Sequence, residues 1–220
     1  MLRRTLHGRT TATLLALGLT ATLAACGGSD SSAEHGGDHG IASVSSAADE
    51  GPYAGRELTE PQARPAFTLT DQSGAVYDFS AKTAGQPTLL FFGYANCPDV
   101  CPTTMADVAL ALRSAPADIA ARTQVVFVTT DPARDTAEFL GTYLARFDEG
   151  LPNRFVGLTG TQAEVEAAQE AAGVPLAEGE GTMHATSLYL FGNDDLARVV
   201  FSAGDTSQSI AQDLMTIAAA

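Results

Sequence analysis

The sequence has few positive charges, few cysteines and few histidines. Its 220 residues include 12 Lys and Arg, 26 Asp and Glu, 3 Cys and 4 His, and the formal net charge is −14. A chain of this charge is repelled by polyanions, which argues against nucleic acid as a partner. An acidic surface also repels anionic lipid headgroups, so any attachment to a membrane needs a separate device.

The N-terminal segment contains such a device. Arg3, Arg4 and Arg9 lie near the start, and residues 10–25 carry no charge. A basic start followed by a short uncharged run is typical of a signal peptide, and the run is short for a bilayer span. It ends in Leu-Ala-Ala-Cys26, which resembles a bacterial lipobox. We therefore expect residues 1–25 to be a lipoprotein signal peptide and Cys26 to be lipid-modified; the alternative is an ordinary secretory signal in which Cys26 is incidental.

Both interpretations place the mature protein outside the cytoplasm, in an oxidising compartment. Lipidation would hold it at the extracytoplasmic face of the bacterial cell membrane. Residues 26–60 are rich in Gly, Ser and acidic residues and are expected to form the lipidated cysteine and a flexible tether. His35 and His39 in this tether could trap Cu(II) weakly, and the alternative is a solvated acidic linker.

Residues 61–220 are expected to form the folded domain. Residues 88–94 and 125–128 are continuous apolar runs, as in buried central strands. Residues 67–79 and 187–201 are expected to form hairpins, each with a polar turn in its middle. The expected helices are 102–113, 135–147, 161–172 and 207–219, and a short strand is expected at 155–158. Strands alternating with helices, followed by a hairpin and a helix, predict an α/β thioredoxin-like fold with an added N-terminal β-hairpin.

The expected domain contains two cysteines, Cys97 and Cys101, and one histidine, His184. The cysteines lie between a buried strand and the following helix, where α/β folds place functional residues. Two thiols four residues apart face the same way if the segment turns helically. The helix N-terminus is expected to lower the pKa of Cys101 and favour its thiolate. Two thiolates make a soft chelate that favours Cu(I), and an imidazole nitrogen supports both oxidation states.

Residues 92–104, Phe-Gly-Tyr-Ala-Asn-Cys-Pro-Asp-Val-Cys-Pro-Thr-Thr, resemble the signature of the Sco/SenC family. These are thioredoxin-like copper chaperones that help to assemble the dinuclear copper centre of cytochrome c oxidase. Residues 131–136 and 157–160 are similar to two further motifs of the family, and the resemblance runs from about Phe67 to the C-terminus. One departure is Asn96, where the family commonly has His.

This resemblance implies that Cys97, Cys101 and His184 bind copper as Cu(I) or Cu(II), and that Asp131 lies near the site. Separately, the spacing of Cys97 and Cys101 in an oxidising compartment predicts that they form a redox-active disulfide in the metal-free protein. The implied partners are the copper-bearing subunit of cytochrome c oxidase and a periplasmic-type copper donor protein. The implied function is that of a chaperone and not of an enzyme.

The residues alone leave alternatives open. A thiol–disulfide oxidoreductase that acts on client cysteines also uses two thiols at a helix N-terminus, although such proteins usually have two intervening residues and do not need His184. A structural disulfide would close a very short loop and remove little chain entropy. A zinc site or a peroxidase centre is weakly supported, since there is no general-base pattern and Tyr94 stands where a peroxidase would have Thr. Asp131 could equally stabilise its own turn.

Overall fold

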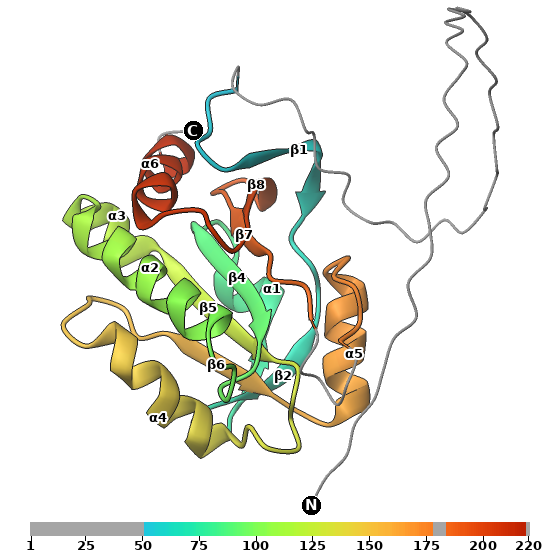
Figure 1. Ribbon diagram of the computed structural model, residues 1–220. Helices are drawn as coiled ribbons and strands as arrows, with labels where there is room; N and C mark the ends of the chain where they lie inside the picture. Colours follow the sequence, from blue (N-terminus) through green and yellow to red (C-terminus); the bar gives the residue numbers. More distant parts are fainter. Residues whose placement is uncertain (1–50, 178–183, 219–220) are drawn as a thin grey trace, which may run out of the picture. The chain divides into compact units, whose positions relative to one another are not determined.

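The computed structural model describes residues 51–177 and 184–218, and Figure 1 shows their arrangement. The predicted signal peptide, Cys26, His35, His39 and most of the predicted tether lie outside these residues. The elements in chain order are β1 (Arg56–Ala63), β2 (Thr68–Asp71), β3 (Val76–Asp78), α1 (Phe79–Thr83), β4 (Thr88–Gly93), α2 (Val100–Ser114), α3 (Ala117–Arg122), β5 (Gln124–Thr129), α4 (Ala137–Asp148), β6 (Val156–Thr159), α5 (Gln162–Ala171), β7 (Leu188–Phe191), β8 (Leu196–Phe201) and α6 (Ser207–Ala218).

The strands form one mixed sheet in the order β1-β8-β7-β4-β5-β6-β2-β3. β4, β5 and β6 run parallel to one another, and β7 runs antiparallel to β4. β4 lies in the middle and all its residues are buried, which explains why its sequence is continuously apolar instead of alternating. The cysteine segment therefore follows directly from the carboxyl end of a buried strand in the middle of the sheet.

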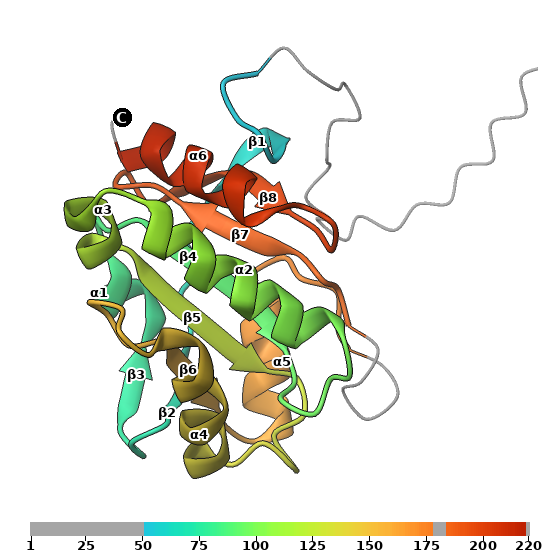
Figure 2. The ribbon, with the colours of Figure 1, turned by 60° about the vertical axis from the view of Figure 1, so that its left-hand side comes forward.

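Helices cover both faces of this sheet, as Figure 2 shows. Leu89 and Phe91 of β4 point to one face and pack with buried residues of α2, α4 and α6. Leu90 and Phe92 point to the other face and pack with Phe79 of α1 and with the buried side of α5. Alternating residues of a single strand thus supply two apolar cores, one above and one below the sheet.

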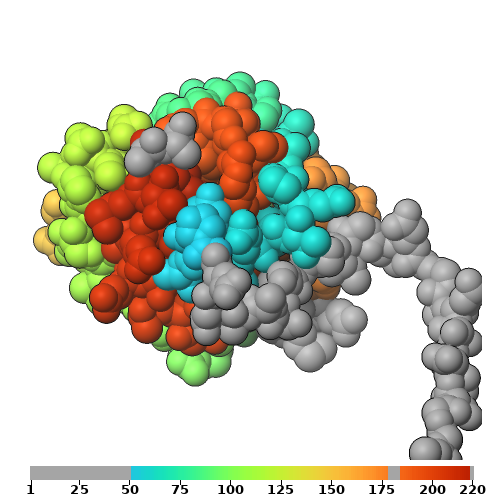
Figure 3. All heavy atoms as spheres, turned by 90° about the horizontal axis from the view of Figure 1, so that it is seen from above, coloured from blue at the N-terminus to red at the C-terminus, as the bar shows by residue number. Residues whose placement is uncertain are grey.

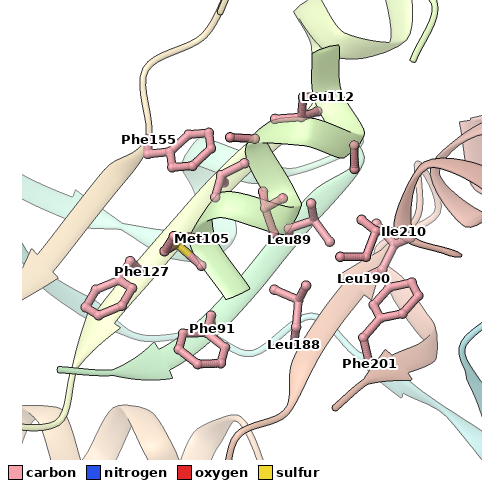
Figure 4. Packing of buried hydrophobic residues seen from close by; sticks show 14 of the residues in the cluster. Leu89, Phe91, Met105, Leu112, Phe127, Phe155, Leu188, Leu190, Phe201 and Ile210 are labelled. Atoms are coloured by element: carbon pink, nitrogen blue, oxygen red, sulfur yellow. The ribbon is translucent and has the colours of Figure 1, made fainter. Parts of the chain in front are cut away.

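Helix α2, which follows the cysteine segment, is held on the first of these faces by its own apolar side chains. Met105 lies over Phe91 and Phe127, and Leu112 lies near Phe155 further along the helix (Figure 4). Met105 is fully buried, so its thioether fills the core. These contacts fix the start of α2 relative to the end of β4.

The thioredoxin-like fold is as the sequence predicted. The added hairpin is β2–β3, in which Leu69 pairs with Tyr77, and it joins the sheet where Thr70 pairs with Thr159 of β6. The predicted hairpin near the C-terminus is β7–β8, and β7 pairs with β4.

The structure differs from expectation at β1, which begins at Arg56, ahead of the expected domain start at Pro61. Leu58 is the buried residue of this edge strand, and charged neighbours surround it, so the segment lacks the apolar alternation that signals a strand. β1 pairs with β8, with an irregularity between Glu57 and Gln62. The short helices α1 and α3 were also unexpected, because 5 and 6 residues are too few to show a helical apolar period.

The segment before β1 is fastened to α6 by one carboxylate. Asp213 is fully buried and accepts hydrogen bonds from the backbone N–H groups of Ala54, at 2.7 Å, and Gly55, at 2.8 Å. A Cβ at Gly55 would lie 2.6 Å from the ring of Phe201, so a glycine is needed for this close approach. Figure 3 shows the segment, in blue, lying against α6, in red.

Within residues 51–177 and 184–218, no helix combines the length and the apolar character that a bilayer crossing requires.

The buried carboxyl of Asp213 is expected to make stability depend on pH. Burial raises its folded-state pKa above the ordinary value of 3.8, so the folded protein holds this proton more tightly than the unfolded chain. The resulting stability is fully present below the unfolded pKa and is lost as the pH rises through the raised pKa. The free energy of unfolding of the wild type minus that of Asp213→Asn should therefore increase between about pH 7 and about pH 4 in urea titrations.

The matched control is Asp118→Asn, which removes the same charge from an exposed position on α3. A pH-dependent difference of equal size in this control would assign the effect to net charge and not to the bonds that Asp213 makes.

Candidate metal centre

The two cysteines occupy different positions at the start of α2. Cys101 lies in the first turn and is fully buried, whereas Cys97 precedes the helix and is half-buried. The backbone N–H of Cys101 donates to Sγ of Cys97 at 3.4 Å. The Cys97 sulfur therefore takes the place of a capping oxygen, and Asp99, which stands at the N-cap position, makes no side-chain capping bond.

His184 reaches the same place from the segment that leads into β7. Its Nδ1 lies 2.8 Å from the backbone oxygen of Ala185. A carbonyl can only accept a hydrogen bond, so Nδ1 carries a proton, and in the neutral imidazole Nε2 is then the nitrogen with the lone pair that can bind a metal. Nε2 lies 3.5 Å from Sγ of Cys101. The rings of Tyr94 and Phe91 stand edge-on to the imidazole, with centroids 5.5 and 6.2 Å away, and hold its orientation.

The ligand atoms of Cys97, Cys101 and His184 all lie within 4.8 Å of one another. Ligand bonds to a metal of this class are about 2.0 Å for nitrogen and about 2.3 Å for sulfur, and two such bonds span the observed 3.5 Å between Nε2 and the Cys101 sulfur at an angle close to tetrahedral. Two soft sulfurs and one imidazole nitrogen form a donor set suited to copper or zinc. The three residues that the sequence singled out are therefore brought together.

The last residue of β4 makes room for this cluster. A Cβ at Gly93 would lie 2.8 Å from the Cys101 sulfur and 2.6 Å from the ring of Phe91, both closer than atoms normally approach. The carbonyl of Gly93 accepts from the backbone N–H of Thr130 at 2.7 Å. The end of β4 is thus hydrogen-bonded to the residue that follows β5, and the Cα of Gly93, which carries no side chain, faces the Cys101 sulfur.

The two thiols have opposite electrostatic environments. Burial raises the pKa of Cys97, but hydrogen bonds from the N–H groups of Cys101 and Asp99, from the Cys101 thiol and from Tyr94 outweigh it, and the pKa ends below its ordinary value. Burial raises the pKa of Cys101, and a backbone bond at Tyr94 offsets this only in part. The expectation that the helix N-terminus lowers the pKa of Cys101 is therefore wrong. Cys101 lies inside the helix, and the free N–H groups point to Cys97.

Asp131 is almost fully buried in the turn that follows β5. Its carboxylate forms an ion pair with Arg134, and its backbone oxygen accepts from the N–H groups of Arg134, at 3.1 Å, and Asp135, at 2.9 Å. These contacts match the turn-stabilising alternative. Asp131 is connected to the cysteine segment through Asp135.

Asp135 is the residue near the site that the sequence did not single out, since it was expected only to begin a helix. Its Oδ2 accepts from the backbone N–H of Ala95 at 2.8 Å and from Oγ1 of Thr129 at 2.7 Å, and the side chain is fully buried. Burial raises its pKa. Asp135 thereby ties the segment before Cys97 to the end of β5. The helix α4 starts later, capped by Thr136, whose Oγ1 accepts from Phe139 N.

The comparison with known families decides the assignment. The SCO1/SenC family model matches residues 55–219. The chain belongs to the SCO1/SenC family. The matched region contains all three members of the Cys97, Cys101 and His184 cluster, so the cluster and the family are found in the same domain.

Several relatives illustrate the family. A Stutzerimonas stutzeri protein, whose name describes it as copper-binding, is 37% identical over 148 residues, covering 64% of this chain and 70% of that protein. Mitochondrial SCO1 of Saccharomyces cerevisiae is 34% identical over 114 residues, covering 51% of this chain and 37% of that protein. For the SCO2-like protein RC0895 of Rickettsia conorii, identity is 37%, with 46% of each chain covered. The match thus spans about half or less of these two SCO relatives.

Two solved structures resemble the fold. Bradyrhizobium japonicum ScoI with copper bound is 33% identical with a TM-score of 0.58, and the match covers 71% of this chain and 99% of that chain. Apo Sco1 of Thermus thermophilus is 28% identical with a TM-score of 0.63, covering 74% and 96%. Both likenesses extend over nearly the whole of the compared domain.

Gly93→Ala is expected to lower the free energy of unfolding by about 1–3 kcal/mol, because the added methyl overlaps the Cys101 sulfur and the ring of Phe91. Urea unfolding of the reduced proteins measures it. Gly141→Ala in α4 is the matched control, since its Cβ would meet Gln72 at 3.4 Å and a helical Ala is favoured over Gly. Equal stability of the two variants would mean that the strand end is not constrained by the cluster.

Proposed function

We propose that this protein is an extracytoplasmic copper chaperone that assists assembly of the dinuclear copper centre of cytochrome c oxidase. The copper ion is its cargo, bound by Cys97, Cys101 and His184. The observation that supports this proposal best is the convergence of two sulfurs and one imidazole nitrogen within 4.8 Å, in a member of the SCO1/SenC family. The solved B. japonicum ScoI, a protein of similar fold, has copper bound.

The chemistry of the three donors suits a cargo ion that changes oxidation state. Thiolates bind Cu(I) strongly because both are soft, and the imidazole adds a ligand that suits Cu(II). Metal binding requires deprotonated thiols, so copper uptake releases protons. The raised pKa of Cys101 makes this the thiol at which copper and protons compete most directly.

The exposure of the ligands suits transfer. Cys97 and His184 are half-buried, whereas Cys101 is buried. An ion held by these three groups would be reached from the side of Cys97 and His184, while Cys101 anchors it from within. A partner's own ligands can then replace the outer two in turn.

A second function, thiol–disulfide exchange with client cysteines, is favoured by the asymmetry of the thiols. Cys97 is partly exposed and has a lowered pKa, as an attacking thiol requires, and Cys101 is buried behind it as a resolving thiol. The Cys97 thiolate would attack a client disulfide to form a mixed disulfide. Cys101 would then attack the Cys97 sulfur of the mixed disulfide and release the client as a dithiol. The client would thereby gain two electrons and two protons from Cys97 and Cys101, which would be joined as a disulfide.

Variants of the ligands separate the two functions. We expect one copper per chain, with His184→Ala weakening or reshaping the Cu(II) site far more than the Cu(I) site, because sulfur dominates the affinity for Cu(I). Cys97→Ser and Cys101→Ser should damage both. The measurements are metal analysis, competition titrations, and the intense sulfur-to-copper charge-transfer absorption of the Cu(II) form.

Gln208→Ala is the control, because it truncates an exposed side chain on α6 that is not part of the three-ligand cluster. If His184→Ala leaves the Cu(II) spectrum and affinity unchanged, the three-ligand site is refuted. Thiol exchange that survives in His184→Ala, alongside unchanged oxidase activity in cells, would favour the oxidoreductase.

We also propose that the mature protein starts at lipid-modified Cys26 and is anchored by it to the extracytoplasmic face of the membrane. The support is the uncharged run of residues 10–25 that ends at Leu-Ala-Ala-Cys26. Cys26→Ser should release the protein from the membrane fraction or leave it unprocessed, as followed by fractionation and mass spectrometry. An unmodified mature N-terminus in the wild type would contradict the anchor.

A further inference from the structure

A groove opens at the start of α2, and close neighbours of the three ligands in the chain line it. It has a volume of about 190 Å³ and lies between the start of α2, the start of β7 and the turn between β8 and α6. Asp99 and Val100 on its α2 side lie in the chain between Cys97 and Cys101, and Thr186 follows closely after His184. A group seated in this groove therefore contacts residues that are close neighbours of the metal ligands in the chain. We call it the α2–β8 groove.

The groove has an apolar interior. Leu188, Phe201 and Ile210 line it and are buried in the first of the two cores. Pockets for small-molecule ligands are usually about 300–1,000 Å³, so a volume of about 190 Å³ is small for a metabolite. It suits one or two apolar side chains of another protein.

The rim of the groove carries unbalanced negative charge. Asp99 and Asp107 both line it, and among the described residues neither carboxylate makes a hydrogen bond or an ion pair. Asp99 is left without a partner because the Cys97 sulfur takes the bond from the Cys101 N–H. Asp205, on the opposite side, accepts hydrogen bonds from the backbone N–H and the hydroxyl of Ser202. Both donors are uncharged, so they do not neutralise its carboxylate. The residues that line the groove include no Lys or Arg.

We propose that the α2–β8 groove docks the protein that exchanges copper with this site, through a segment in which an apolar side chain is flanked by Lys or Arg. This inference rests on the proposed function. The apolar interior supplies the pocket for the side chain, and the carboxylates of Asp99 and Asp107 complement its basic neighbours. Charge complementarity of this kind speeds encounter and fixes orientation while leaving the complex short-lived, as metal exchange requires.

A binding experiment tests the chemistry of the occupant. The full-length protein, in a neutral detergent, is titrated with three fluorescent nine-residue peptides: one with a central Leu flanked by Lys, one with Glu in place of Lys, and one with Ser in place of Leu. Only the first should bind. Asp107→Lys should weaken its binding by about fivefold or more, and Asp107→Asn by less.

The control is Asp118→Lys, which changes the net charge by the same amount at an exposed position on α3, outside the groove. It should change binding by less than about twofold. If Asp107→Lys and Asp118→Lys weaken binding of the first peptide equally, the binding is explained by general attraction to an acidic surface, and the proposal is overturned. Equal binding of the Lys and Glu peptides would also overturn it.

Oxidase activity in cells separates failure of this inference from failure of the proposed function. Purified Asp107→Lys should bind one copper with an unchanged charge-transfer band, yet cells that carry it should lose oxidase activity that cells with Asp118→Lys retain. If His184→Ala abolishes oxidase activity and Asp107→Lys leaves it intact, docking in the groove is refuted and the chaperone function stands. If His184→Ala itself leaves oxidase activity intact, the proposed function fails.

Discussion

Strand β4 has to be covered on both faces, and the candidate site follows from that requirement. All of its residues are buried, so helices must pack above and below it. The chain leaves β4 at Gly93, and the next segment is held by the buried carboxylate of Asp135 before it enters α2. Because Met105 locks α2 onto the same sheet, both cysteines are fixed relative to the core from which they emerge.

The start of α2 gives two thiols different chemical environments, because Cys97 precedes the helix and Cys101 lies in its first turn. Cys97 receives the hydrogen bonds at the helix N-terminus, and Cys101 is enclosed by apolar side chains. Metal binding would use this pair by coordination, and the proposed thiol–disulfide exchange would use it by forming a covalent bond. His184 is the residue that favours metal binding, since its Nε2, the ring nitrogen that does not bond to the Ala185 carbonyl, faces the Cys101 sulfur.

Much of the fold could be predicted from the sequence because strong local patterns encode it. The apolar run of β4, the hairpins and the cysteine motif each have a period or spacing that a single segment displays. Edge strand β1 has one buried residue, Leu58, and short α1 and α3 show no period, so these were missed.

The parts of the site that could not be predicted depend on distances between segments. Asp135 and Ala95 are 40 residues apart in the chain, and only the folded structure shows that they bond. The pKa of Cys101 was predicted in the wrong direction because the spacing of two cysteines does not show how deeply each thiol is buried, and burial raises the pKa of Cys101. α2 starts at Val100, ahead of the proline that seemed to mark its start, and this puts Cys101 inside it.

The hydrogen bond from His184 Nδ1 to the Ala185 carbonyl has a consequence for the net charge of a copper-loaded site. It leaves Nε2 as the ring nitrogen that can bind a metal, so a copper ion held by two thiolates and a neutral imidazole would have ligands with a total charge of −2. With Cu(II) the assembly would be neutral, and with Cu(I) it would carry −1. The nearby carboxylates of Asp99 and Asp135 would oppose that added electron. The acidic surroundings would therefore shift the reduction potential of the bound ion downward and favour its oxidised form.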